Sequence, residues 1–452
     1  MFILTIILVV FTVLLSPIHA ETLREMLTRS FHASNELDTQ RFVVQETNEA
    51  HARAYALIRP SATATVDFGI ISGRNDIAGV SSTKTGHSAV AEIAGSQPLY
   101  TFGRFGAAID SAEIASRSAL LTYDSKVQSF LADAALAYFD LIGARQKLRV
   151  TKNNVDVLRS QLRATQDRFE VGELTRTDVA LARSRLARVA EAELAAAESD
   201  LRAAEASYLR ISSEMPQEAS FPGQFNFLPA TLEEAYQLAE ENAFSIRLAT
   251  IAVDLAEKKI VGAKAEFQPQ VKLKSSVKTS DSEYPNDTQS TSLGVIAELS
   301  VPLYNAGLLR SKVRETESVY AQKRAMVLNE RTLVREKVTK SWSELTSKLS
   351  TMSSGKIAVQ AAKLALQGTR EEYNVGERTL VDVLDAEQDF LEASVQLIQS
   401  EVGWYKSQVT LAETIGIFTP QMLGLKLDQS ALVMPPVTEP AWYEDVKMPT
   451  LW

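Results

Sequence analysis

The side chains that could carry out chemistry in this chain are carboxylates rather than thiols or imidazoles. The 452 residues include no Cys and only four His, and the His have no paired spacing. Without Cys, the chain cannot carry out thiol catalysis or form thiolate metal sites. Four His without paired spacing give little support to a His-based triad or metal site. We therefore expect no catalytic, cofactor-binding or metal-binding residues. Asp178 and Asp382 each stand near the expected start of a helix, where a carboxylate interacts favourably with the helix dipole. Asp385 follows Asp382 at i, i+3, so both carboxylates can face one side.

Two copies of one unit position these carboxylates. The Val-Gly pairs Val171-Gly172 and Val375-Gly376 are separated by 376 − 172 = 204 residues. Two pairs of prolines have the same offset of 204 residues: Pro98 with Pro302, and Pro216 with Pro420. The sequence predicts a duplicated half-molecule, with a signal peptide at 1–20, a first repeat at 21–228, a second repeat at 229–428 and a periplasmic tail at 429–452.

Each half shows the same order of elements. A first helix is predicted at about 23–57 and again at 232–265, and a proline ends each. Period-two alternation then predicts hairpins at 62–97 and 271–301, with polar turns at 72–87 and 280–288. Proline-free stretches rich in helix-forming residues follow, each bent at its Val-Gly pair into two long helices. In the first half, the helix after the Val-Gly pair returns along the first one. Its apolar stripe, or seam, shifts by one residue near Ala190.

The sequence also limits where the chain works. Its net charge of −9 argues against a nucleic-acid partner. An apolar N-terminus ending at Ala20 resembles a cleaved secretory signal, with an uncleaved anchor as the alternative, and no later run is expected to form a membrane helix. The four strands have the length of membrane strands, ~9–11 residues, but a soluble sheet with one wet face alternates in the same way. Four membrane strands cannot close a barrel, so several chains would have to contribute around an axial lumen, with the helices continuing as a tube.

Motifs within the repeats resemble a known family. Pro98-Leu-Tyr and Pro302-Leu-Tyr-Asn-Ala-Gly stand at the strand-to-helix junctions, and residues 373–386 read Tyr-Asn-Val-Gly-Glu-Arg-Thr-Leu-Val-Asp-Val-Leu-Asp-Ala. From about residue 22 to 425 the chain is similar to TolC-type outer-membrane efflux channels. The resemblance implies a mainly α fold with a small transmembrane β part, in which long antiparallel coiled-coil helices form a tube. It also implies a homotrimer with a twelve-stranded barrel in outer-membrane lipid, served by a periplasmic adaptor and an inner-membrane ABC or proton-driven transporter.

The resemblance implies roles for three groups of residues. Asp382 and Asp385 match an acidic constriction, two rings of carboxylates that favour cations. A latch that holds the end shut is matched by Arg378, Tyr373, Asp178 and Thr177. The tips that meet the adaptor are matched by Val171, Gly172, Val375 and Gly376. Taken without the resemblance, all these residues can be solvated helix ends, caps and turns.

The implied function is an exit duct rather than an enzyme. The absence of Cys departs from lipidated multidrug channels, and with the short Trp-ended tail it favours type I protein secretion. A multidrug efflux channel is the first alternative. A soluble periplasmic coiled-coil adaptor is the second, but it does not explain two hairpins at equivalent places.

Overall fold

The computed structural model describes residues 21–77, 80–216, 218–223, 225–283 and 287–425. The predicted signal peptide and tail therefore lie outside the described residues. The described chain forms two compact units: unit 1 takes in residues 21–40, 124–246 and 331–425, and unit 2 takes in 41–123 and 247–330. Each unit contains segments from both halves, so the two repeats fold through one another rather than as separate bodies.

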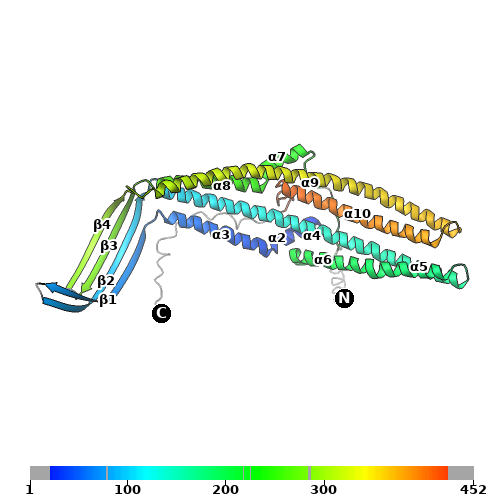
Figure 1. The fold of residues 1–452 in the computed structure, drawn as a ribbon, viewed down its shortest axis with the longest axis horizontal. Coiled ribbons are helices and arrows are strands. Elements are labelled where there is room, and N and C mark those ends of the chain that lie inside the picture. Colours follow the sequence, from blue (N-terminus) through cyan, green and yellow to red (C-terminus); the bar gives the residue numbers. More distant parts are fainter. Residues whose placement is uncertain (1–20, 78–79, 217, 224, 284–286, 426–452) are drawn as a thin grey trace, which may run out of the picture. The chain divides into compact units, whose positions relative to one another are not determined.

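Both halves contain the predicted series of helix, hairpin and helical hairpin, so the mainly helical fold with four strands is confirmed (Figure 1). The first half consists of α2 (Leu23–His32), α3 (Asn35–Ala56), β1 (Ser61–Ile77), β2 (Val80–Tyr100), α4 (Arg104–Glu170), α5 (Arg176–Ala187), the π-helix η1 (Arg188–Glu193) and α6 (Leu194–Ser212). The second half consists of α7 (Leu232–Asn242), α8 (Phe244–Ala265), β3 (Gln270–Ser282), β4 (Thr288–Ser300), α9 (Leu308–Asn374) and α10 (Leu380–Thr414).

The first helix of each half is broken, which corrects the expectation of one continuous helix. The break before α3 lies at Ser34, whose hydroxyl accepts a hydrogen bond from the Leu37 backbone N–H at 3.2 Å and so starts a new helix. The break before α8 lies at Ala243, whose ψ of 118° is outside the helical range. The two breaks are 243 − 34 = 209 residues apart, the offset between Pro60 and Pro269. They are therefore a property of the repeated unit.

The four strands of unit 2 form one antiparallel sheet in the order β1-β2-β3-β4 (Figure 1). The β2–β3 pairing joins the hairpins of the two halves, and β1 and β4 are the edges. The first hairpin is longer than predicted, because residues assigned to a polar turn pair instead, with Ser72 opposite Thr85. The Thr85 hydroxyl donates to the Ser72 hydroxyl at 2.9 Å. Such cross-strand polar pairs stabilise strands that carry turn-like residues.

Large apolar side chains are exposed on this sheet. Phe68 on β1 is 82% exposed and Leu293 on β4 is 77% exposed. Further exposed apolar residues of the sheet are Val66, Ile70, Ile93, Val295 and Ile296. An exposed apolar surface of this kind marks contact with a partner or with lipid.

One described helix, α4, includes a stretch apolar enough to cross a membrane by length and composition, contrary to the expectation of none after the leader. Of that stretch, 67% is buried within the chain. Burial accounts for its apolar composition, because core helices are also rich in apolar residues.

A π-helix confirms the predicted slip of the seam near Ala190. η1 spans Arg188–Glu193, directly between α5 and α6. The buried seam residues Ala182, Val189 and Ala197 are spaced by seven and then by eight residues. The one extra residue in the second interval is the residue that a π-bulge inserts, so the same helix face stays buried on both sides of it.

Candidate constriction at the Val-Gly turns

The two Val-Gly turns of unit 1 have the same backbone geometry. Gly172 and Gly376 have φ values of +83° and +84°. A Cβ added at either glycine would meet no atom within 4 Å, so glycine is needed for the left-handed backbone rather than for space. At the first turn the Gly172 N–H donates to the Phe169 carbonyl at 3.0 Å and the Glu173 N–H donates to the Arg168 carbonyl at 2.9 Å. These two bonds form a Schellman motif, which ends the long helix.

A capping box starts the returning helix after each turn. At α10 the Asp382 carboxylate accepts from the Thr379 backbone N–H at 2.9 Å and from the Thr379 hydroxyl at 2.7 Å. At α5 Asp178 binds Thr175 over the same two distances. The hydrogen bonds from the side chain and backbone of Thr379 hold the pKa of Asp382 below its usual range. The expectation that these carboxylates stand at helix starts is confirmed, and Asp382 stays ionised at neutral pH.

An apolar cluster packs together the helices that flank the two turns. Buried residues come from α4, α5, η1 and α10: Val155, Leu158, Ala182, Val189, Leu380 and Leu384. Tyr373, from the end of α9, packs against this cluster. The two helical hairpins thus contact each other through side chains of the helices next to their turns. This packing holds in place the helix starts that carry the carboxylates.

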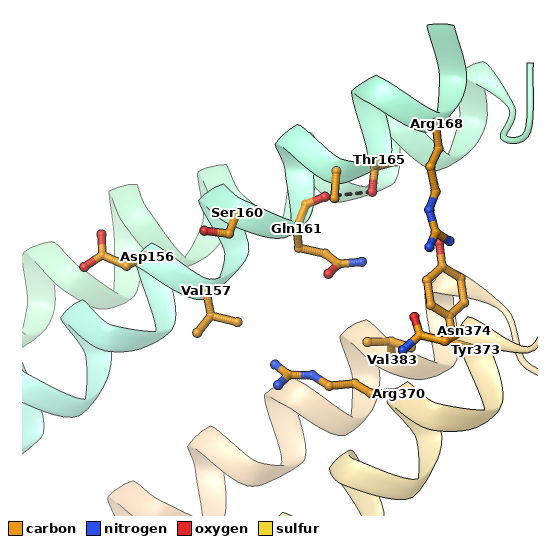
Figure 2. Close-up of a pocket in the computed structure, with 11 residues that line it drawn as sticks. Asp156, Val157, Ser160, Gln161, Thr165, Arg168, Arg370, Tyr373, Asn374 and Val383 are labelled. Atoms are coloured by element: carbon orange, nitrogen blue, oxygen red, sulfur yellow. Dashed lines mark hydrogen bonds between the residues drawn. The ribbon is translucent and has the colours of Figure 1, made fainter. Parts of the chain in front are cut away.

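A cavity of about 630 Å³ lies beside this cluster (Figure 2). Gln161, Thr165 and Arg168 of α4 line one side of it, and Arg370 and Tyr373 of α9 line the other. The Arg168 guanidinium carbon lies 5.3 Å from the centre of the Tyr373 ring, within range of a cation–π interaction. The hydroxyl of Tyr373 has no hydrogen-bond partner among the described residues.

Arg378 and Thr177, two of the predicted latch residues, lie on the surface next to the turns. The Arg378 Nε donates to the Glu372 carboxylate at 2.8 Å. Thr177 is exposed on the first turn of α5. Among the described residues, no hydrogen bond or ion pair joins Arg378 or Thr177 to Asp178 or Tyr373 within one chain, so the latch stays a prediction.

Asp385 lies on the exposed surface of α10 and binds a residue that sequence reasoning missed. The Arg185 guanidinium of α5 forms an ion pair with the Asp385 carboxylate. One helical turn further along, Arg188 Nη2 donates to the Gln388 Oε1 at 2.9 Å. No sequence signal places Arg185 beside Asp385, because the two residues belong to different halves and are brought together by the tertiary fold.

A buried ion pair was also missed. Glu387 is 3% exposed, and its Oε1 accepts from Arg370 Nη2 at 2.7 Å while its Oε2 is buried without a partner among the described residues. The sequence does hold a signal for it. Leu380, Leu384 and Leu391 mark the buried face of α10, and Glu387 interrupts that stripe at helical spacing.

The described residues contain no group of three or more His, Asp or Glu side chains that could hold a metal ion. The arrangement at the turns presents charge. It consists of two ionised or ion-paired carboxylates per chain on α10, exposed valines on the turns, and an aromatic–guanidinium contact.

A sequence model of outer membrane efflux proteins matches this chain twice, at residues 30–210 and 235–417. The chain belongs to the outer membrane efflux protein family. The two matches also confirm the internal duplication, one match for each half.

Several relatives are similar to the chain. The outer membrane efflux protein BepC of Brucella suis biovar 1 is 28% identical over 305 residues, which cover 67% of this chain and 66% of BepC. The outer membrane protein TolC of Escherichia coli K12 is 25% identical over 389 residues, covering 83% of this chain and 77% of TolC. The proteases secretion protein PrtF of Dickeya chrysanthemi is 24% identical over 287 residues, covering 62% of each chain. The crystal structure of CusC has the same fold, with a TM-score of 0.77 at 18% identity over 87% of this chain and 92% of CusC.

Family membership makes this chain an outer-membrane efflux channel of Gram-negative bacteria and not an enzyme. The soluble-adaptor alternative is thereby excluded. The hairpins of unit 2 are the candidate membrane-contacting part, and the turns of unit 1 are the candidate constriction.

Proposed function

We propose that three copies of this chain form one passive exit duct for secreted proteins. The observation that carries the proposal is the open sheet of unit 2, whose edge strands β1 and β4 are unpaired with any other strand of the described chain. Unpaired strand edges in lipid cost several kcal/mol for each backbone group. Pairing β1 of one chain with β4 of the next satisfies both edges, and three chains with four strands each give twelve strands.

Side-chain exposure supports contact between this sheet and lipid. Apolar residues on β1 and β4 are open to the surroundings, as described above. Aromatic residues stand next to the strand ends, where membrane barrels place aromatic girdles. Tyr304 is 90% exposed and Tyr100 is 57% exposed. These rings would lie at the boundary between hydrocarbon and water.

The turns of unit 1 form the closed end of the duct in this proposal. Asp382 and Asp385 of three chains make two carboxylate rings, which favour cations. Tyr373 and Thr177 have hydroxyl groups without partners in the described chain, so each is available to a neighbouring copy. With Arg378 and Asp178 they form the latch between copies, and such surface contacts are individually weak enough to break on engagement.

The tips of the turns suit an adaptor. Val171 is 72% exposed and Val375 is 74% exposed. Both protrude next to a glycine, so a helical partner can approach the backbone of Gly172 and Gly376 closely. An inner-membrane transporter, ABC or proton-driven, would deliver cargo through that adaptor.

The cargo class rests on the relatives. PrtF is a proteases secretion protein, and the lack of Cys in this chain fits the same class. Efflux of small toxic molecules is the second candidate, favoured by the similarity to the efflux protein BepC. Deleting the gene and measuring both secreted proteins and drug susceptibility separates the two. Loss of secreted proteins with unchanged susceptibility supports type I secretion, and the reverse result supports efflux.

The duct itself is tested on full-length protein from outer membranes. Mild detergent electrophoresis with and without heating should show a heat-sensitive trimer, and planar bilayers should show a small cation-selective conductance. Asp382→Ala combined with Asp385→Ala should enlarge the conductance and weaken its cation selectivity. A protein that stays monomeric, or that gives no conductance, refutes the trimeric duct.

A further inference from the structure

We propose that Arg185 sets the charge of the constriction and clamps it shut, by binding Asp385 of the same chain. The inference rests on the proposed role of Asp385 at the constriction. It adds a positively charged residue to a site that the sequence predicts to be purely acidic. Arg185 would therefore determine both ion selectivity and resistance to opening.

The clamp has two contacts with α10, one from α5 and one from the first residue of η1. Arg185 binds Asp385, and Arg188 donates to Gln388 at 2.9 Å. Gln388 is itself held, because its Nε2 donates to Glu392 Oε1 at 2.6 Å. On both helices the two residues are spaced i, i+3, so they share one face.

Burial makes Arg185 the anchored member of the pair. Its side chain is 22% exposed, whereas the Asp385 side chain is 56% exposed. Arg185 is thus held against the helix pair while Asp385 remains open to the surroundings. The positive charge of the Arg185 guanidinium offsets the negative charge of the exposed Asp385 carboxylate.

The pair is not a by-product of the duplicated turn. With the repeat offset of 204, Arg185 corresponds to Asp389 (185 + 204 = 389) and Asp385 corresponds to Leu181 (385 − 204 = 181). The equivalent pair in the other half would join a leucine to an aspartate and cannot form. Each chain therefore has a single Arg–Asp clamp here, between α5 and α10, in contrast to the capping boxes, which occur in both halves.

Formal charges predict how the clamp acts in a trimer. Asp382 and Asp385 bring six carboxylates and Arg185 brings three guanidinium groups, so these residues together contribute −6 + 3 = −3 to the constriction. Replacing Arg185 by Gln gives −6, and replacing Asp385 by Asn gives −3 + 3 = 0. The double variant returns to −3, while all three variants lose the clamp. Charge and clamping therefore separate in one set of proteins.

The test is single-channel recording of Arg185→Gln, Asp385→Asn and the double variant as heat-sensitive trimers in planar bilayers. At 0.1 M KCl, where the Debye length is ~10 Å, the cation-to-anion permeability ratio should rise roughly threefold for Arg185→Gln and fall roughly threefold for Asp385→Asn. The double variant should match the wild type in selectivity. All three should conduct more than the wild type, because the helices are no longer tied. At 1 M KCl the selectivity differences should shrink.

Arg183→Gln is the matched control. Arg183 is an exposed arginine on the same helix, with no ion pair among the described residues. Equal selectivity shifts for Arg183→Gln and Arg185→Gln overturn the inference, as does a double variant that differs from the wild type in selectivity. Unchanged conductance in all three clamp variants also overturns it. If the wild type conducts and any of these three refuting results appears, this inference fails while the proposed duct stands. If the wild type forms no channel, the proposed duct fails as well.

Discussion

Replacing Glu413 by Gln should stabilise the protein at neutral pH and not in acid. Glu413 lies in the last turn of α10 in unit 1. Burial, and to a smaller extent the nearby Asp133 carboxylate, raise its pKa to about 6. The pKa of Asp133 is itself raised, chiefly by burial. The backbone carbonyl of Glu413 accepts from Gln128 Nε2 at 2.7 Å, so the carboxyl group is held in this partly buried place.

The magnitude follows from the two pKa values. A carboxyl group whose pKa is about 6 in the folded chain and 4.5 in the unfolded chain binds protons more tightly when folded. Its stabilising effect is complete below pH 4.5 and is lost as the pH rises through 6. The difference of about 1.5 corresponds to about 2 kcal/mol at 1.36 kcal/mol for each pKa unit. Because the group is partly open to solvent, we reduce the expected penalty at pH 7.5 to about 1 kcal/mol.

The assay is thermal unfolding of the purified protein in detergent from pH 4 to pH 8. Glu413→Gln should raise the midpoint by about 1–2 °C at pH 7.5, given the large unfolding entropy of a chain of this size. The gain should vanish below pH 4.5, where the wild-type carboxyl is already neutral. Asp389→Asn, an exposed change on the same helix, should give no pH-dependent difference. A constant gap between wild type and Glu413→Gln across this range would refute the reasoning.

Three further predictions concern the constriction. Arg370→Met leaves the Glu387 carboxylate buried without a partner and should cost about 2–3 kcal/mol in chemical unfolding; adding Glu387→Leu should restore most of that stability, and no restoration would contradict the account of the pair. Gly376→Ala should cost about 1 kcal/mol, because its φ of +84° disfavours any side chain. Gly368→Ala, inside α9 with equally open space around it, should stabilise by about 0.5–1 kcal/mol; a loss of stability in both glycine variants would show that space rather than backbone conformation matters. Thr379→Ala removes the hydroxyl half of the α10 capping box and should cost about 1 kcal/mol, matched by Thr175→Ala at α5; unequal losses in hydrogen exchange at the two helix starts would show that the two boxes differ.

The sequence predicted those features that local chemistry determines. The Val-Gly turns and the capping carboxylates depend on residues close together in the chain, and the duplication is visible as motifs repeated at one fixed offset. The slip near Ala190 was also readable, because a seam of buried residues fixes helix phase. All of these need no knowledge of the tertiary neighbours.

The features that were missed have different physical causes. Asn75 and Asp76 are typical turn residues, yet they pair with the opposite strand because the ladder continues through them. The ion pair of Arg185 joins helices that are far apart in sequence. The Ser34 cap of α3 is local, because the Ser34 hydroxyl binds the Leu37 N–H three residues further on, but it lies in the middle of an otherwise helical pattern. At the hairpin and at the ion pair, pairing with another element outweighed the local preference.

The pairing of β2 with β3 has a consequence for how the chain is made. Gly95 lies opposite Ser275, so residues separated by 275 − 95 = 180 positions must meet before the sheet can form. Each hairpin can close soon after its own synthesis, but closure of the long loop between them comes later and is slow. Until then both hairpins display apolar side chains and open edges in water. The newly exported chain therefore passes through an aggregation-prone stage, and its survival depends on the second half arriving before another chain does.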